Sequence, residues 1–114
     1  MKNEVIIDGE VYVKKEKMTD NIVLVRTHSA GVHFGELAYQ SNDGKLVTLK
    51  NAKRLWKWVG AASLSQVAID GVTDKKQTMI PPAVPEITLT EAIEIIPMTE
   101  KAVKNLSEVP VWKK

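Results

Sequence analysis

The chain has 114 residues, 44% of them hydrophobic and 26% charged, a balance that favours a single folded domain over residues 1–114 and excludes a wholly disordered chain. The formal net charge of +2, from sixteen Lys and Arg against fourteen Asp and Glu, is too small to indicate a nucleic-acid-binding protein by itself. The absence of cysteine excludes disulfides, thiolate metal sites and cysteine nucleophiles.

The beginning of the chain and its hydropathy predict a cytosolic protein. Glu4, Asp8 and Glu10 stand where a signal peptide needs an apolar core. No apolar run approaches the roughly 20 residues of a membrane span. We therefore expect a cytoplasmic protein with no membrane partner.

The first half of the chain predicts an antiparallel meander. Asp8-Gly9 and Asp43-Gly44 each lie between apolar runs, which is typical of hairpin turns. Gly31 permits a further turn. Five strands are expected, at residues 4–7, 11–14, 21–26, 32–39 and 45–50.

Two later segments are also expected to be strands. Residues 54–59, R-L-W-K-W-V, alternate as a strand does, and three of their side chains would then share one face: Arg54, Trp56 and Trp58. Residues 86–96 are ambiguous between helix and strand, but their isoleucines and threonines favour one strand that Pro97 ends. An extended connector before it is predicted by Pro81, Pro82 and Pro85.

Helix caps mark the rest of the second half. Ser63 and Gly71 are typical of the two ends of a short helix, and Thr99 is typical of the start of another. The helices are expected at about residues 64–69 and 99–106, followed by a final edge strand at 109–112. The fold class is therefore predicted to be α+β, an antiparallel, open or barrel-like sheet with one or two short helices.

The segment R-T-H-S-A-G-V-H-F-G, residues 26–35, is the first candidate site. Small residues let a ligand approach the backbone, while guanidinium, hydroxyl and imidazole groups suit a phosphate or a ribose. Its candidate ligand-binding residues are Arg26, Thr27, His28, Ser29, Gly31 and His33. The alternative is a glycine-containing turn between strands, with the histidines at its rim. In either case we expect Ser29 and His33 to lie outside the core.

The second candidate site is the segment of residues 53–66, K-R-L-W-K-W-V-G-A-A-S-L-S-Q. Trp and Arg side chains form stacking platforms for bases, and a helix N-terminus attracts an anion. Its candidate ligand-binding residues are Arg54, Trp56, Trp58, Ser63 and Ser65. The alternative is that the tryptophans belong to the core and Ser63 only caps a helix.

Motifs of catalysis are not found in the sequence. There is no nucleophile elbow, no Walker-type loop and no dinucleotide fingerprint. His28 and His33 alone rarely suffice for zinc. We therefore expect no enzyme activity, no metal and no cofactor.

Four strings resemble a known family: V-R-T-H-S-A-G-V-H-F-G-E-L, L-K-N-A-K-R-L-W-K-W-V-G-A-A-S-L-S-Q-V-A-I-D-G-V, I-T-L-T-E-A-I-E-I-I-P-M-T-E-K-A and V-P-V-W-K-K. The chain is similar, from about Ile22 to its C-terminus, to small proteins of bacteriophages and prophages that carry a domain of unknown function. The resemblance implies a genome context and no activity. Small phage proteins of this kind are often counter-defence factors, structural accessories or helpers in DNA transactions. Some of the counter-defence factors are sponges that trap the nucleotides that signal infection.

By this analogy we expect a phage-encoded protein that acts in the host cytoplasm and sequesters a small nucleotide-type ligand, a cyclic nucleotide or an ADP-ribose derivative. A homo-oligomer is expected, with residues 87–96 at its interface. The alternatives are a single-stranded nucleic-acid-binding accessory protein and a protein-binding inhibitor of a host defence enzyme. A continuous basic groove would favour nucleic acid, whereas a pocket with few charges would favour a small ligand.

Overall fold

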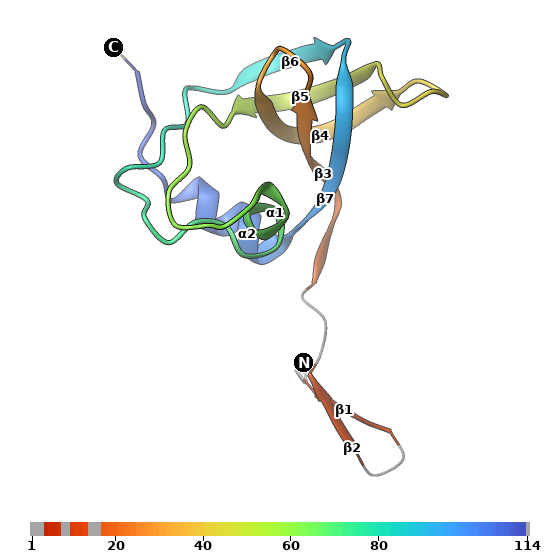
Figure 1. The fold of residues 1–114 in the computed structure, drawn as a ribbon, viewed down its shortest axis with the longest axis vertical. Coiled ribbons are helices and arrows are strands. Elements are labelled where there is room, and N and C mark those ends of the chain that lie inside the picture. Colours follow the sequence, from red (N-terminus) through yellow and green to blue (C-terminus); the bar gives the residue numbers. More distant parts are fainter. Residues whose placement is uncertain (1–3, 8–9, 14–16, 114) are drawn as a thin grey trace.

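Strands and two short helices make up the described part of the chain, residues 4–7, 10–13 and 17–113 of a computed structural model (Figure 1). The elements are β1 (Glu4–Ile7), β2 (Glu10–Val13), β3 (Met18–Thr27), β4 (Val32–Gln40), β5 (Val47–Arg54), α1 (Leu64–Asp70), β6 (Val84–Leu89), β7 (Ala92–Thr99) and α2 (Glu100–Ser107). The predicted α+β class is confirmed. Strands β1 and β2 pair with each other in a separate sheet, and the predicted turn residues Asp8 and Gly9 lie outside the described residues.

The main sheet is antiparallel, with the strand order β6-β5-β4-β3-β7. Its two edge strands, β6 and β7, follow each other in the chain with only Thr90 and Glu91 between them. The sheet therefore curls until its edges meet at this end (Figure 1), where the backbone N–H of Ala92 donates to the carbonyl of Lys45 at 3.0 Å. The sheet is open and does not close into a barrel, because β6 and β7 do not pair.

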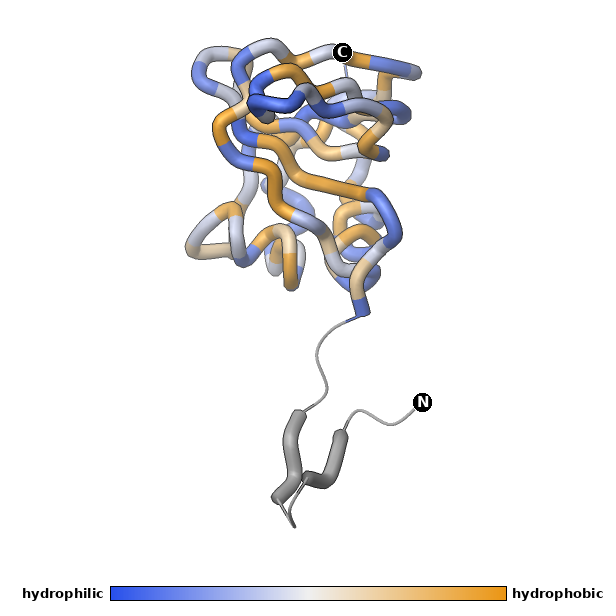
Figure 2. The backbone as a smooth tube through the Cα atoms, turned by 90° about the vertical axis from the view of Figure 1, so that its right-hand side faces the viewer, coloured by the Kyte–Doolittle hydropathy of each residue, from blue (hydrophilic) through white to orange (hydrophobic). Residues whose placement is uncertain are grey.

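The curled sheet buries side chains on both faces. Leu24 and Val25, neighbours on β3, are both fully buried and belong to different hydrophobic clusters. Val25 packs with side chains of β5 such as Leu49, whereas Leu24 belongs to the cluster that includes α1 and α2. Figure 2 shows hydrophobic stretches along the strands with hydrophilic residues between them. Each fully buried aliphatic side chain contributes about 1.5–3 kcal/mol, so both clusters stabilise the sheet.

The pairing of β4 with β5 is interrupted at Gly35. The register shifts between Phe34 and Glu36, and Asn51 on the opposite strand has a φ of 50°. A Cβ at Gly35 would lie 2.9 Å from the carbonyl oxygen of Lys50, so only glycine lets the two backbones approach this closely. Such bulges increase the local twist, which fits the strong curl of the sheet.

Both helices begin at the residues that the sequence predicts. The Ser63 hydroxyl accepts from the Gln66 backbone N–H at 3.2 Å, and Gly71, with a φ of 81°, ends α1. The Thr99 hydroxyl accepts from the Ala102 N–H at 3.0 Å. These are ordinary cap geometries, and they stabilise helices that are too short to persist alone.

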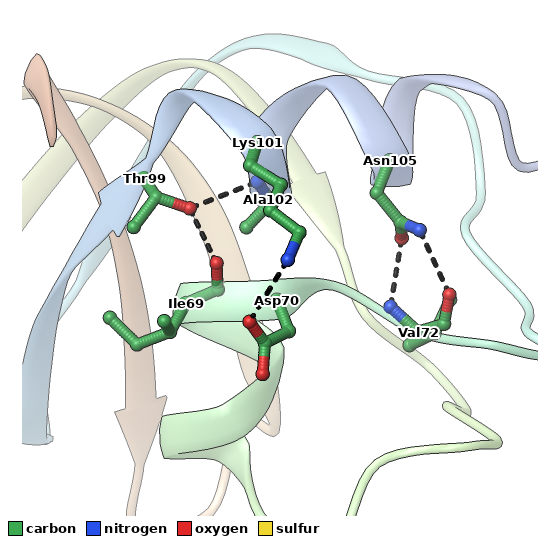
Figure 3. A network of polar contacts seen from close by, with 7 residues as sticks. All are labelled: Ile69, Asp70, Val72, Thr99, Lys101, Ala102 and Asn105. Carbon is green, nitrogen blue, oxygen red and sulfur yellow. Dashed lines mark hydrogen bonds and ion pairs between the residues drawn. The ribbon is translucent and has the colours of Figure 1, made fainter. Parts of the chain in front are cut away.

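Polar contacts join the two helices (Figure 3). The Thr99 hydroxyl also donates to the Ile69 carbonyl at 2.6 Å, and Thr99 is completely buried. The Asn105 side chain accepts from the Val72 N–H at 2.8 Å and donates to the Val72 carbonyl at 2.9 Å. Lys101 forms an exposed ion pair with Asp70. The end of α1 is thereby attached to α2 along its length.

Three strand predictions are wrong. Residues 54–59 do not form a strand: β5 ends at Arg54, and beyond it Lys57 makes only an isolated bridge to Met79. Residues 86–96 form parts of two strands on opposite edges of the sheet, and Pro97 lies inside β7. Proline is tolerated there because an edge strand leaves one side unpaired. In residues 109–112, Val111 bridges Ile80 without forming a strand.

Within the part of the chain that the structure describes, no helix has the length and apolar character needed to cross a membrane.

Candidate functional site

A cleft of about 320 Å³ lies between the turn that follows β3 and the segment that follows β5. The structure brings several sequence-predicted residues together in its wall: Ser29, Gly31, Arg54, Trp56 and Trp58. Ala30, Val32 and Leu55 complete the lining. The volume lies at the lower end of the range of about 300–1,000 Å³ that is usual for small-molecule sites.

The turn between β3 and β4 is held by the buried side chain of Thr27. Its hydroxyl donates to the carbonyl of Gly31 at 2.8 Å and accepts from the N–H of Ala30 at 2.8 Å. Gly31 has a φ of 82°, a conformation that favours glycine. Thr27 therefore fixes the shape of the turn through its hydroxyl and does not line the cleft.

Arg54 projects from the last position of β5 toward this turn. One of its terminal nitrogens, Nη1, donates to the carbonyl oxygen of Ala30 at 2.8 Å. A Cβ at Gly31 would lie 3.4 Å from the same nitrogen, so the glycine leaves room for the guanidinium beside the backbone. Among the residues that the structure describes, no carboxylate forms an ion pair with Arg54. Its charge is not neutralised there, and most of its five N–H donors are available to an anion.

His33 lies below the cleft, and the prediction that it stands outside the core is wrong. Only 2% of its surface is exposed, and its Nε2 donates to the Ala30 carbonyl at 2.9 Å. Burial lowers the pKa of His33 below its ordinary value, the hydrogen bond to Ala30 opposes this shift, and the nearby charge of Arg54 lowers the pKa further. The imidazole is therefore a neutral donor that supports the turn.

Two indoles give the cleft an aromatic wall. Trp56 is 60% exposed, so it is not a core residue. Trp58 is half-buried and packs against the hydrophobic cluster between sheet and helices. Trp112 stacks on Trp56, with ring centroids 6.4 Å apart and planes 13° from parallel. Trp112 was not predicted, and the signal that could have found it was the presence of a third tryptophan in a chain with few aromatic residues.

Two carboxylates, one in β7 and one in the turn before it, bind part of the first candidate segment. The Arg26 Nε lies 3.1 Å from Glu94 Oε1 in an exposed ion pair, and the Ser29 hydroxyl donates to the Glu91 carboxylate. The backbone N–H of His28, whose side chain is exposed, donates to the Glu91 carbonyl at 3.0 Å. Arg26 and His28 do not line the cleft, and Ser29 lines it with its hydroxyl already bonded.

Ser63 and Ser65 also lie apart from the lining of the cleft. Ser63 caps α1, and the Gln66 side chain accepts from the Ala62 N–H at 2.8 Å, so part of the helix terminus is satisfied within the protein. Ser65 is an exposed residue of the first turn of α1. The structure therefore separates these two hydroxyls from Arg54 and Trp56.

A second, smaller cavity of about 160 Å³ adjoins Arg54 on another side. Its wall combines His33, Ala52 and Arg54 from the sheet with Pro81 and Pro82 of the connector and with Val84 and Ile87 of β6. Apart from Arg54 and His33, these side chains are apolar. Arg54 is thus shared by the two cavities.

The chemistry available at this place is that of binding. A guanidinium without a carboxylate partner among the described residues, exposed backbone of small residues and a flat indole can hold an anion that is joined to a planar ring. No group of three or more histidine or acidic side chains that could hold a metal ion occurs in the described residues.

Comparison with known proteins gives one match. A family model described as a domain of unknown function (DUF6948) matches residues 20–106, which include most of β3, all of β4 to β7 and α1, and most of α2. No significant match was found among curated proteins or among solved structures.

Proposed function

Because this chain belongs to the DUF6948 family, whose description assigns no activity, we propose its function from the cleft: the protein binds and sequesters a small nucleotide-derived signal and does not convert it. One observation carries this proposal. The guanidinium of Arg54, which has no carboxylate partner among the described residues, lies in the same cleft wall as the exposed indole of Trp56.

The two groups differ in what they recognise. A guanidinium binds a phosphate through paired N–H donors, and an indole stacks on a base. Gly31, an exposed residue without a side chain, lines the same cleft. A nucleotide presents both a phosphate and a base, whereas a simple anion or a simple aromatic compound would use only half of the site.

Sequestration is favoured over conversion by the way the polar groups near the cleft are used. The Ser29 hydroxyl donates to Glu91, and the Nε2 of His33 donates to the Ala30 carbonyl. Neither arrangement gives a serine with an imidazole base beside it. Together with the resemblance to phage and prophage proteins, this favours a phage-encoded, homo-oligomeric sponge that acts in the host cytoplasm against an immune signal.

One observation favours a second function, the binding of single-stranded nucleic acid. The stacked, exposed pair of Trp56 and Trp112 offers a surface on which successive bases could stack. Such a site would need cations along a track, and its affinity would depend strongly on salt.

Titration of the purified protein decides between these functions. The probes are AMP, ADP-ribose, a cyclic dinucleotide and a ten-nucleotide single-stranded DNA, each at low and high salt, followed by calorimetry and native mass spectrometry. We expect a small nucleotide to bind with modest salt dependence. Binding of the oligonucleotide alone, lost steeply with salt, would support the second function, and no binding of any probe would overturn both.

A further inference from the structure

Arg54 borders two cavities, and this position indicates which class of nucleotide the site prefers. Its side chain borders the 320 Å³ cleft beside Trp56 and also the 160 Å³ cavity beside Val84. An anion held by this guanidinium would therefore lie next to both spaces. A ligand with one organic arm can occupy only one of them.

The smaller cavity has the properties of a site for an uncharged group. Its walls are formed by prolines and aliphatic side chains, and among the described residues that line it Arg54 alone is charged. The His33 imidazole at its edge is held neutral, since burial lowers its pKa. A second phosphate would find no further cation there, whereas a ribose or a ring would find apolar surface and one arginine donor group.

We propose that the site takes a phosphodiester or pyrophosphate that carries two organic arms, with the phosphate at Arg54, one base against Trp56 and the second arm in the cavity formed by Pro81, Pro82, Val84 and Ile87. This inference rests on the proposed function and names its ligand class: two-armed nucleotides, in preference to mononucleotides. Cyclic dinucleotides, linear dinucleotides and ADP-ribose derivatives share this chemistry.

The physical reason for the preference is the additional burial. A mononucleotide leaves the smaller cavity empty, while a second arm removes apolar wall from water and gains affinity roughly in proportion to the area buried. Both arms are joined through the same phosphodiester or pyrophosphate link, so the second arm is held close to its cavity once the first is bound.

The test compares AMP with ADP-ribose and with linear and cyclic diadenylate on three proteins: wild type, Val84→Trp and Thr88→Trp. Val84 is 43% exposed, so an indole at this position can fill the cavity mouth without disturbing the core. Thr88 is an exposed residue of the same strand outside the cavity lining, and T88W is the matched control. Circular dichroism melting checks that each variant folds.

We expect wild type and T88W to bind at least one two-armed nucleotide ten or more times more tightly than AMP. V84W should lose this advantage and keep its affinity for AMP. Equal affinities for AMP and the two-armed ligands in wild type, or an unchanged ratio in V84W, would overturn this inference while leaving the proposed function intact. If wild type binds no nucleotide at all, the proposed function itself fails.

Discussion

His33 and Arg54 are cross-strand partners on β4 and β5, and their side chains donate to the same acceptor, the carbonyl oxygen of Ala30. The two distances are 2.9 Å and 2.8 Å. A single backbone carbonyl thus ties the turn after β3 to both strands that follow it. Because Arg54 is permanently charged, a second positive charge on His33 is disfavoured at this place.

This arrangement predicts that stability falls on mild acidification. The pKa of His33 is lower in the folded state than its ordinary value of 6.5, so between the two values the unfolded chain binds a proton that the folded chain does not. Stability is therefore fully present above about pH 7 and is lost as the pH falls through the ordinary histidine range, by at most about 1.4 kcal/mol per pH unit. Urea denaturation at pH 7.5 and pH 5.5 measures the loss.

Replacement of His33 by Gln provides the control for this pH effect. An amide can still donate to the Ala30 carbonyl but does not titrate. The H33Q variant should therefore lose less stability than wild type between the two pH values, even if it is less stable at both. An equal loss in both proteins would mean that His33 is not the group responsible. The lowered pKa values of Asp43 and Glu108 act only at more acidic pH.

Trp56→Ala should weaken ligand binding while leaving the fold stable. The side chain is 60% exposed, so its removal takes little from the core. Stacking on a base contributes about 1–3 kcal/mol, which corresponds to a loss of affinity of about 5- to 150-fold. Calorimetric titration of the small nucleotide that wild type binds measures the change. An unchanged affinity in W56A would mean that the Trp56 indole does not contact the ligand.

Arg54→Lys tests the phosphate contact separately. Lysine keeps the charge but loses the planar, paired donors, and it cannot hold both the Ala30 carbonyl and an anion in the same geometry. We expect weaker binding by R54K of every phosphate-bearing ligand. The matched control is Lys53→Arg, one position earlier and outside the cleft lining, which should bind as wild type does. If R54K binds as tightly as wild type, the phosphate lies elsewhere.

Thr99→Val should destabilise the protein by about 2–4 kcal/mol, because it removes the α2 cap and leaves the Ile69 carbonyl unsatisfied. Valine keeps the shape of the buried side chain, so the loss reports the hydroxyl. Thr99→Ser keeps the hydroxyl and loses one methyl group, which costs about 1 kcal/mol. Thermal and urea denaturation give both values. A larger loss in T99S than in T99V would assign the role of Thr99 to packing.

Ile93→Lys should turn an oligomer into a monomer. The predicted interface, residues 87–96, is divided between the two edges of the sheet. For pairing with a second copy, β7 offers the longer run without proline, Ala92–Ile96, whereas Pro85 shortens that of β6. Ile93 is 55% exposed on this strand. Light scattering at micromolar concentration should give a multiple of the 12.7 kDa chain mass for wild type and the single mass for I93K. A monomeric wild type would contradict the prediction.

Features with a local cause could be predicted from the sequence. The caps at Ser63, Gly71 and Thr99 depend on residues within one helical turn, and the turn at Asp43-Gly44 depends on its own backbone. The sequence also marked Arg54 and the residues of the 28–32 turn as candidate ligand-binding residues, but it placed Arg54 in a strand over residues 54–59 that does not form. The side chains meet because β5 pairs with β4, and not because residues 54–59 form a strand of their own.

Features set by distant parts of the chain could not be predicted in this way. The division of residues 86–96 follows from pairing with β5 on one side and β3 on the other, and the turn at Thr90 and Glu91 contains no glycine, proline or asparagine to mark it. The burial of His33 and the stacking of Trp112 on Trp56 likewise depend on neighbours far along the chain. The residue types in the sequence do not indicate which of these distant side chains will meet.

Thr90 and Glu91 join two strands that stand at opposite edges of the sheet, so neither edge is complete until residues 84–99 dock together. The meander of β3, β4 and β5 has mostly short-range pairings and can form first, but β6 and β7 pair with residues far back in the chain, and such long-range contacts slow folding. Until then both edges of the growing sheet expose unpaired backbone to other chains. The link through Thr90 and Glu91 therefore couples the docking of one edge strand to the docking of the other.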